Sequence, residues 1–391
     1  MTDIRKIDTT TNEEILRMSE YAFQYRLSEK EFQLKKKETE SHCVFGSYED
    51  GRLAAKVHTI PLEVFIQGKT FKMGGVAGVA TWPEFRRKGH VKELLRTSLE
   101  EMKRQGQVVS FLHPFSIPFY RKYGWELLFE QKNSKIPVTD LKRKWDIKGN
   151  MRRLPFDDRT ISSIHPVYEA FASSYNGPLK RTDNWWKSRV WKEDLVIAVG
   201  YTESGQEDSY IIYKVQDRIM EVRDYAYSTV EGLQRLLEFM SNHDSMAEHI
   251  QVTVPANDKM HLLFDNRHLE QKIKAYFMGR IVDAERFLQV YPYSPHPKLQ
   301  PFVITVEDSF MPTNSGNYLF SELDGAVKVQ KINDHNYPTV HCSIQQLSAV
   351  MLGYQRAKDL AILQLISGDS PAIQQLDTII KEKQTYIPDF F

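Results

Sequence analysis

Cysteine is scarce in this chain of 391 residues, where only Cys43 and Cys342 occur. Two cysteines so far apart cannot build the disulfide framework of a small secreted domain. No run of about 18 apolar residues is present, so we expect no membrane-spanning helix. Residues 1–6 also lack the apolar core of a signal peptide. These absences predict a cytoplasmic protein that has no membrane partner.

A surplus of one charge is also missing. Lysine and arginine total 52, aspartate and glutamate total 51, and the formal net charge is +1. Domains that bind nucleic acid are usually strongly basic, so this balance argues against a nucleic-acid partner. The spacing of histidine and cysteine matches no metal site, and we expect no metal.

The length predicts two to four domains, because a domain takes roughly 100–200 residues. In the first third, hydrophobic spacing predicts helices and strands in the order 15–25, 42–48, 53–60, 70–80, 91–102, 108–112, 116–123 and 125–132. Asp50-Gly51 predicts a hairpin turn. Gly74, Gly75 and Gly78 lie inside a predicted strand, where glycine marks a bulge or a close backbone approach.

The middle third repeats this order of elements. Strands are expected at 195–202, 209–215 and 218–227, then a helix at 230–240 and a strand at 249–254. The last third starts with a helix near 280–290, followed by strands at 302–306, 318–322 and 326–330 and helices at 343–350, 356–363 and 371–376. The predicted fold class is α+β, with two copies of one fold and a small α+β domain, at 1–145, 146–282 and 283–391.

The most informative segment runs from Val79 to Lys92 and reads as a strand, a basic loop and a helix. The loop holds Arg86-Arg87-Lys88-Gly89 directly before the helix. A helix N-terminus has unpaired N–H groups and a favourable dipole, so it binds anions. Pyrophosphate suits this arrangement, although the spacing is neither a Walker motif nor a dinucleotide fingerprint. The loop alone is read equally well as a solvated basic turn.

Two motifs in the first third resemble one family. Residues 86–91, Arg-Arg-Lys-Gly-His-Val, resemble the Arg/Gln-x-x-Gly-x-Gly/Ala loop of GCN5-related N-acetyltransferases (GNAT), which holds the acetyl-CoA pyrophosphate. Residues 118–125, Pro-Phe-Tyr-Arg-Lys-Tyr-Gly-Trp, resemble the tyrosine-bearing helix of that superfamily. Val91 departs from the usual glycine or alanine. Over the whole length, the chain resembles the enhanced intracellular survival (Eis) family, which has a sterol-carrier-like third domain and forms homo-oligomers.

That resemblance implies tandem GNAT folds, a homohexamer and acetyl-CoA as the acetyl donor. The second copy is degenerate, since residues 228–231 hold no basic loop, and we infer that it does not bind CoA. The residues implied in donor binding are Val79, Ala80, Thr81, Arg86, Arg87, Lys88, Gly89, His90, Val91, Lys92, Phe115 and Ser116.

The resemblance also implies the catalytic residues. Tyr120 would protonate the departing CoA thiolate, because a tyrosine with an ordinary pKa near 10 keeps its proton at neutral pH. Tyr123, three residues later, is its rival. The terminal carboxylate of Phe391, or a water, would accept the proton of the incoming amine.

The expected function is acetyl transfer to a primary amine of a small molecule, in a ternary complex with acetyl-CoA. The family includes enzymes that acetylate aminoglycosides and polyamines. Candidate acceptor-binding residues are Phe23, Tyr25, His113 and Asp389. Two alternatives stay open: a protein that senses CoA or a lipid without turnover, and an enzyme that transfers a different acyl group.

Overall fold

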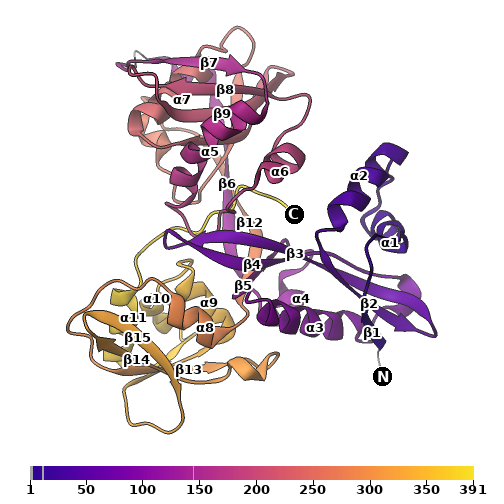
Figure 1. Cartoon of the computed structure of the whole chain (residues 1–391). Coiled ribbons are helices and arrows are strands. Elements are labelled where there is room, and N and C mark those ends of the chain that lie inside the picture. Colours follow the sequence, from indigo (N-terminus) through magenta and orange to yellow (C-terminus); the bar gives the residue numbers. More distant parts are fainter. Residues whose placement is uncertain (1–2, 11–12, 144) are drawn as a thin grey trace.

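The computed structural model describes residues 3–10, 13–143 and 145–391 (Figure 1). The strands of these residues form one sheet of twelve strands and one of five. The large sheet runs through the first and second domains, and the small sheet belongs to the third. The predicted α+β class is confirmed.

The first domain follows the predicted order of helices and strands. Its elements are β1 (Asp3–Lys6), α1 (Glu14–Phe23), α2 (Glu29–Thr39), β2 (Cys43–Glu49), β3 (Arg52–Ile66), β4 (Lys69–Thr81), η1 (Pro83–Phe85), α3 (His90–Arg104), β5 (Val109–Leu112), α4 (Ile117–Arg121), β6 (Glu126–Pro137) and η2 (Val138–Leu141). The Asp50-Gly51 turn is confirmed, because these residues have φ of 50° and 76° and join β2 to β3. Sequence reasoning missed α2, which buries only Phe32 and Thr39 and so shows little apolar periodicity.

Helices cover both faces of the first part of the large sheet. Apolar residues of α3, such as Leu95 and Leu99, pack with Val57 and Val76 on one face. On the other face, Ile15 of α1 belongs to a separate cluster that also holds Val44 and Ala80. Successive strand residues point to opposite faces, which explains how β2 and β4 contribute to both clusters.

The second domain contains the repeated order and three elements that sequence reasoning missed. Its elements are β7 (Asn150–Leu154), α5 (Asp158–Ala172), α6 (Asp183–Trp185), η3 (Trp186–Val190), β8 (Val196–Tyr201), β9 (Glu207–Gln216), β10 (Ile219–Tyr227), α7 (Val230–Ser241), β11 (His249–Val254), η4 (Met260–Leu263) and β12 (Glu270–Ile281). The missed elements are β7, α5 and β12.

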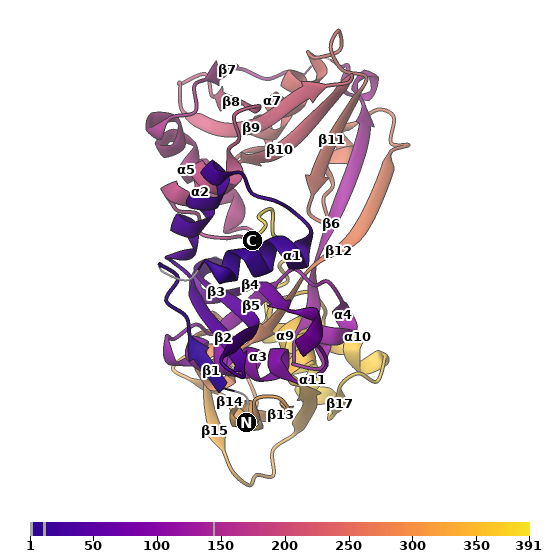
Figure 2. The same ribbon diagram turned by 90° about the vertical axis from the view of Figure 1, so that its right-hand side faces the viewer.

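The first two domains exchange strands within the large sheet. The strand order is β1-β2-β3-β4-β5-β12-β6-β11-β10-β9-β8-β7. The strand predicted at 125–132 is present as β6, but it does not pair with β5. Instead β12 pairs with β5, and β6 lies beyond β12 and pairs with β11. Figure 2 shows β6 and β12 running side by side between the two halves. The expected helix start near 280 was also wrong, since β12 extends to Ile281.

The third domain packs helices against its own sheet and against the large one. Its elements are α8 (Ala284–Val290), β13 (Phe302–Glu307), η5 (Pro312–Asn314), β14 (Gly316–Leu323), β15 (Ala326–Ile332), β16 (Thr339–Ser343), α9 (Ile344–Met351), α10 (Ala357–Ile362), β17 (Ser367–Gly368) and α11 (Ser370–Ile379). Helix α9 contacts β6 and β12. A fully buried ion pair between Arg280 of β12 and Asp308 ties this domain to the large sheet.

The last segment, residues 380–391, which we call the tail, leaves the third domain and returns to the centre of the molecule (Figure 1). The backbone of Asn176 donates to the Gln384 carbonyl at 2.9 Å and accepts from the Tyr386 N–H at 2.9 Å. The side chain of Asn176 accepts from the Gln67 N–H at 2.7 Å and donates to the Leu352 carbonyl at 2.8 Å. One buried residue therefore joins the tail to all three domains.

Candidate active site

Strand β4 changes its partners where the predicted glycines lie. Its pairing with β5 ends at Val76↔Leu112, although β4 continues to Thr81. On the other edge, the register with β3 shifts around Gly78, whose φ is +56°. The bulge predicted from glycine is confirmed. Beyond Val76, β4 has no strand on its β5 side among the described residues, so its backbone groups there are free to bind a ligand.

A cavity of about 660 Å³, which we call the loop cavity, opens between this free edge and the basic loop. Gly89, with φ of +89°, precedes α3 and leaves the first N–H groups of the helix without a side-chain cap. Arg87 also has a positive φ, of 65°. Ten of the twelve residues implied in donor binding line this cavity: Val79, Ala80, Thr81, Arg86, Arg87, Gly89, His90, Val91, Lys92 and Phe115.

The other two implied residues, Lys88 and Ser116, are not among the residues that line the loop cavity. The Lys88 ammonium pairs with Glu49 of β2. The same carboxylate accepts from His90 Nε2 at 3.1 Å, and Ser47 lies 2.8 Å from His90 Nδ1. These bonds hold the loop against the sheet, and they lower the pKa of Glu49. Ser116 precedes α4 as its N-cap residue.

A second cavity, of about 540 Å³, adjoins the first, and we call it the tail cavity because Phe390 and Phe391 line it. It contains Phe23, Tyr25 and His113, three of the four candidate acceptor-binding residues. The two cavities share Phe23, Val79 and Phe115, so they meet at the bulge of β4.

The two candidate tyrosines face different cavities. Tyr120 lines the tail cavity and is 3% exposed, and burial raises its pKa well above the ordinary value. Tyr123 lines the loop cavity. Burial raises the pKa of Tyr123 as well. Both side chains therefore keep their protons at neutral pH. The two candidates for general acid differ instead in the cavity that each lines.

Phe391 reaches the first domain across a long separation in sequence. Its ring lies 4.9 Å from that of Phe277 and 6.4 Å from that of Trp185, centroid to centroid. A Cβ added to Gly75 of β4 would stand 2.7 Å from the Phe391 ring. This is the close approach that a glycine inside the strand predicted.

Asp389 does not lie where the sequence interpretation expected it, because its carboxylate does not line the tail cavity. It is 5% exposed and accepts from Arg181 Nε at 3.0 Å and from Trp185 Nε1 at 2.8 Å. Arg181 also donates two hydrogen bonds to Asp224, at 2.7 and 3.0 Å. This buried cluster of Asp389, Arg181, Asp224 and Trp185, which we call the tail clamp, anchors the tail to the second domain. Sequence reasoning missed Arg181, which lies 208 positions from Asp389.

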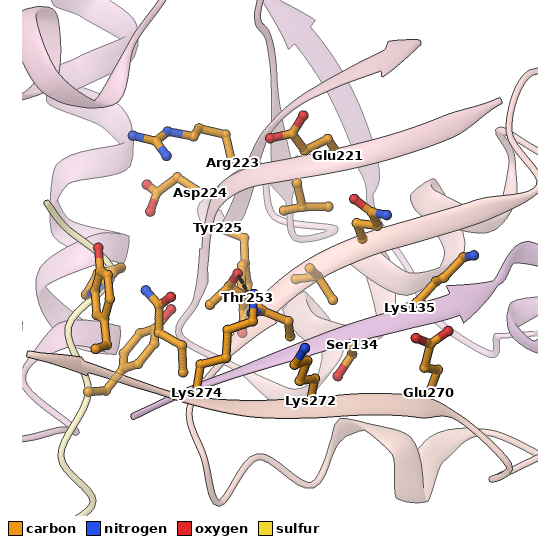
Figure 3. Close-up of a pocket in the computed structure, with 18 residues that line it drawn as sticks. Ser134, Lys135, Glu221, Arg223, Asp224, Tyr225, Thr253, Glu270, Lys272 and Lys274 are labelled. Carbon is orange, nitrogen blue, oxygen red and sulfur yellow. Dashed lines mark hydrogen bonds between the residues drawn. The ribbon is translucent and has the colours of Figure 1, made fainter. Parts of the chain in front are cut away.

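The second domain has a helix start in the same position but with different chemistry. Thr229 caps α7 by accepting from the Gly232 N–H at 2.9 Å, and its hydroxyl donates to Asp208 at 2.8 Å. A carboxylate therefore stands beside the N-terminus of α7, where the first domain has arginines. Near the tail clamp, a separate groove of about 460 Å³ crosses β6, β10, β11 and β12. Figure 3 shows its mixed charges, with Lys272 and Glu270 both on β12.

Lys56 and His58 of β3 were also missed. Lys56 is fully buried, and His58 lines the tail cavity. The signal was present in Leu53-Ala-Ala-Lys-Val-His58, where a lysine interrupts an otherwise apolar strand. Buried lysines are rare, so such an interruption is informative.

Neither a metal-binding cluster nor a membrane-spanning helix occurs among the described residues. No group of three histidine, cysteine, aspartate or glutamate side chains there is arranged to hold a metal ion. Among the same residues, no helix has both the length and the apolar character needed to cross a membrane.

Family models match three successive parts of the chain. An acetyltransferase (GNAT) domain matches residues 3–128, a second acetyltransferase (GNAT) domain matches 177–281, and a sterol carrier protein domain matches 284–388. A Streptomyces griseus protein named an uncharacterized N-acetyltransferase is 24% identical over 195 residues. That match takes in 48% of this chain and 43% of the relative, so the chain spans less than half of the relative's length.

Solved structures match the whole chain. A protein of unknown function from Enterococcus faecalis, described as a probable N-acyltransferase, is 25% identical with a TM-score of 0.92, and all of both chains is covered. Eis1 from Mycobacterium abscessus is 20% identical with a TM-score of 0.83, again over all of both chains, and it shares the fold. The repeated fold and the sterol-carrier-like third domain are confirmed. The chain therefore contains two GNAT acetyltransferase domains followed by a C-terminal sterol carrier protein domain, and it shares its overall fold with Eis1.

Proposed function

We propose that this chain transfers the acetyl group of acetyl-CoA to a primary amine of a small molecule, with both substrates bound together. One observation supports this most. The loop cavity, with features that suit an anion, meets the tail cavity, with a tyrosine and a chain terminus, at the bulge of β4. Such a junction brings two substrates together, and that proximity contributes to catalysis.

The loop cavity is the proposed donor site. The pyrophosphate of acetyl-CoA would contact the N–H groups at the start of α3 and the side chains of Arg86, Arg87 and Lys92. The pantetheine arm would pair with the backbone of residues 79–81, as an added strand pairs with a sheet edge. Lys88 and His90 would act indirectly, since their side chains hold the loop through Glu49.

Tyr120 is the proposed general acid. In the reaction, a nitrogen–carbon bond forms, the carbon–sulfur bond breaks, and the sulfur takes a proton. Tyr120 faces the tail cavity next to Val79, at the junction of the two sites, and its raised pKa keeps a proton available. Tyr123 is its rival, but it lines only the loop cavity.

The terminal carboxylate of Phe391, or a water beside it, is the proposed acceptor of the amine's proton. The tail clamp and the contact of Phe391 with Gly75 support this proposal, because they hold the last residue inside the tail cavity. Asp389 would then serve as an anchor of the tail, since protein donors already bind its carboxylate.

The residues that line the tail cavity indicate which kind of acceptor it suits. The family resemblance suggested an aminoglycoside or a polyamine. However, the described residues that line the cavity include no aspartate or glutamate, and its two cations, Lys35 and Arg189, pair with Glu38. The Phe391 terminus is then the one carboxylate among the lining residues described, and it offers a partner for a single ammonium group, so we favour an acceptor with a single amine. Phe23, Tyr25 and His113 would contact its carbon framework.

Acetyl-CoA turnover with matched amines tests both parts of this proposal. A monoamine such as tyramine, together with lysine and ornithine, would be compared with cadaverine and putrescine, which lack the carboxylate, and with spermidine and an aminoglycoside. We expect transfer to monoamines or amino acids to exceed transfer to the polycations. Binding of acetyl-CoA without acetylation of any amine would instead favour the sensor that the sequence left open. Equal rates with longer acyl-CoA donors would favour a broader acyltransferase.

Further features of the whole protein remain proposals. We infer that the second domain does not bind the donor, because Thr229 already caps the start of α7 and no basic loop precedes that helix. The homohexamer rests on the family resemblance, and mass photometry would test it. The proposed cytoplasmic location agrees with the free thiols of Cys43 and Cys342.

A further inference from the structure

Two buried titratable side chains beside the tail cavity, Lys56 and His58, and the partly exposed His42 have no role in the function proposed above. Lys56 is 0% exposed, and its Nζ lies 2.8 Å from Ser19 Oγ, 2.7 Å from His58 Nε2 and 3.1 Å from the Gly78 carbonyl oxygen. His58 Nδ1 in turn lies 3.3 Å from His42 Nδ1. The order Ser19, Lys56, His58, His42 is thus a continuous chain of hydrogen-bonding groups.

This chain borders the place where the proposed reaction occurs. Ser19, His42, His58 and Gly78 line the tail cavity, and the Gly78 carbonyl belongs to the bulge of β4. Lys56 lies directly behind that bulge. His42, at the other end, is partly exposed just before β2. The chain therefore runs along the wall of the tail cavity, from the hydroxyl of Ser19 past the bulge of β4 to a partly exposed histidine.

The absence of a carboxylate partner makes Lys56 unusual. Among the described residues, no aspartate or glutamate pairs with it, and burying an unpaired ammonium is costly. Burial, together with the smaller effect of the charge of Lys35, lowers the pKa of Lys56 to about 7. Both the charged and the neutral amine are therefore accessible near neutral pH.

Each form of Lys56 requires one pattern of protons on the two rings. A charged Lys56 donates to His58 Nε2, so His58 carries its proton on Nδ1 and donates it to His42 Nδ1. His42 then carries its proton on Nε2. A neutral Lys56 instead accepts from His58 Nε2, and His42 donates from Nδ1 to His58. Changing one form into the other moves both ring protons and releases one proton at His42 Nε2.

We propose that Ser19, Lys56, His58 and His42 form a proton relay that carries the proton of the acceptor amine from the tail cavity to the surface. The Ser19 hydroxyl passes a proton to Lys56 and receives one from the amine, directly or through the Phe391 carboxylate. Lys56 passes a proton to His58, His58 passes one to His42, and His42 releases one to water. Each residue ends with the number of protons it had at the start, and the two ring protons must return to their starting nitrogens before the next turnover.

The relay rests on the proposed function. It would carry away the amine's proton, which the Phe391 carboxylate cannot hold. An α-carboxylate has an ordinary pKa near 3.5, so the Phe391 terminus cannot keep a proton at neutral pH. Other charged or titratable groups face the relay: Lys35 and Glu38 of α2 and Arg189 of η3 near His42, and Tyr25 after α1 beside Ser19. Glu38 pairs with both Lys35 and Arg189. Burial lowers the pKa of His42 to about 4 and the charge of Glu38 opposes this only in part, so His42 does not keep a proton that it receives.

NMR of the full chain with ¹⁵N-labelled histidine tests the relay without an activity assay. Between about pH 5.5 and 8.5, we expect His58 to shift its proton from Nδ1 to Nε2 and His42 to shift in the opposite direction. The two rings should share one midpoint, and the transition should vanish in Lys56→Met. Fixed tautomers over this range, or a transition that survives Lys56→Met, would overturn the relay.

Kinetics then test its role in transfer. With acetyl-CoA and an accepted amine, kcat should rise with pH through the neutral range, because Lys56 accepts a proton only when neutral. Lys56→Met and His42→Gln should lower kcat at least tenfold, remove this rise and leave the KM for acetyl-CoA unchanged. Lys132→Met and His243→Gln are matched controls far from both cavities. Lys132 is 6% exposed and donates to the Asp258 carbonyl at 2.7 Å.

The outcomes separate the two proposals. A wild-type chain that binds acetyl-CoA but acetylates no amine overturns the proposed function, and with it the relay. Transfer by the wild type with unchanged pH profiles in Lys56→Met and His42→Gln overturns the relay alone. If Lys56→Met does not fold, His42→Gln still decides the matter, since His42 is partly exposed.

Discussion

The Gly75→Ala substitution would place a methyl group where the Phe391 ring now lies. A Cβ at this position would stand 2.7 Å from Cε2 and 3.0 Å from Cδ2 of that ring. Carbon atoms in contact prefer about 3.5–4.0 Å, so the ring would have to move by roughly 1 Å. Gly75 does not have a positive φ, so alanine adds no backbone strain. The carboxylate of Phe391 would move together with its ring.

The expected loss follows from this displacement. A misplacement of about 1 Å in a reacting arrangement can cost about 100-fold in rate, and overpacking costs about 1–3 kcal/mol of stability. We therefore expect Gly75→Ala to lower kcat by about 10- to 100-fold, with a modest fall in the thermal midpoint. The assay is release of CoA thiol in the presence of an accepted amine, together with thermal unfolding of the same samples.

A matched variant and a double variant make this test specific. Gly279→Ala crowds β12 to the same degree, since its Cβ would lie 2.8 Å from Leu128, but it does not touch the tail. It should lose stability without a matching loss of kcat. Phe391→Ala keeps the terminal carboxylate and removes the ring, so adding Gly75→Ala to that variant should lower kcat little further. If the two substitutions lower kcat additively, or if Gly75→Ala and Gly279→Ala have equal kcat, the idea that β4 positions the Phe391 carboxylate is refuted.

Three further substitutions test other parts of the site. Tyr120→Phe should lower kcat by roughly 10²- to 10⁴-fold while Tyr123→Phe stays near wild type in the same assay, and the reverse ranking would exchange their roles. Arg87→Ala should raise the KM for acetyl-CoA by about 10-fold or more, because it removes a charge-assisted contact, and should spare the KM for the amine; an unchanged donor KM would remove Arg87 from the donor site. Arg181→Met leaves the carboxylates of Asp224 and Asp389 facing each other, so it should cost about 3–5 kcal/mol in chemical denaturation and also lower kcat; a loss of stability with full kcat would show that the tail clamp does not position Phe391.

Local features of this chain could be predicted from its sequence. The Asp50-Gly51 hairpin was recognisable because its turn requires positive φ, which this residue pair adopts readily. Glycines in β4 predicted the bulge at Gly78 and the close approach at Gly75 for a similar reason. In each case, the requirement and the residue that meets it are neighbours in the chain.

Elements stabilised by distant contacts were harder to predict. Helix α2 has a polar sequence, and its capping box at Ser28 and its contact with the rest of the fold through Phe32 leave little periodic signal. The exchange of β6 and β12 was missed because a strand's own pattern says which face is buried but not which strand lies beside it. Asp389 was interpreted as an open charge because nothing near it in sequence indicates its partner, Arg181.

The two cavities differ in the same way in how far the sequence predicts them. The loop cavity is built mainly from contiguous residues, 79–92, so the sequence by itself determined its basic charge, its glycine and the helix start that follows. The tail cavity combines residues from α1, α2, β3, β4, the start of α4 and η3 with the last two residues of the chain, and only the tertiary structure decided that they meet. The physical reason is that turn and helix preferences act over a few residues. Burial of Lys56, docking of the tail and approach of Phe391 to Gly75 depend instead on packing between segments that are far apart in the chain.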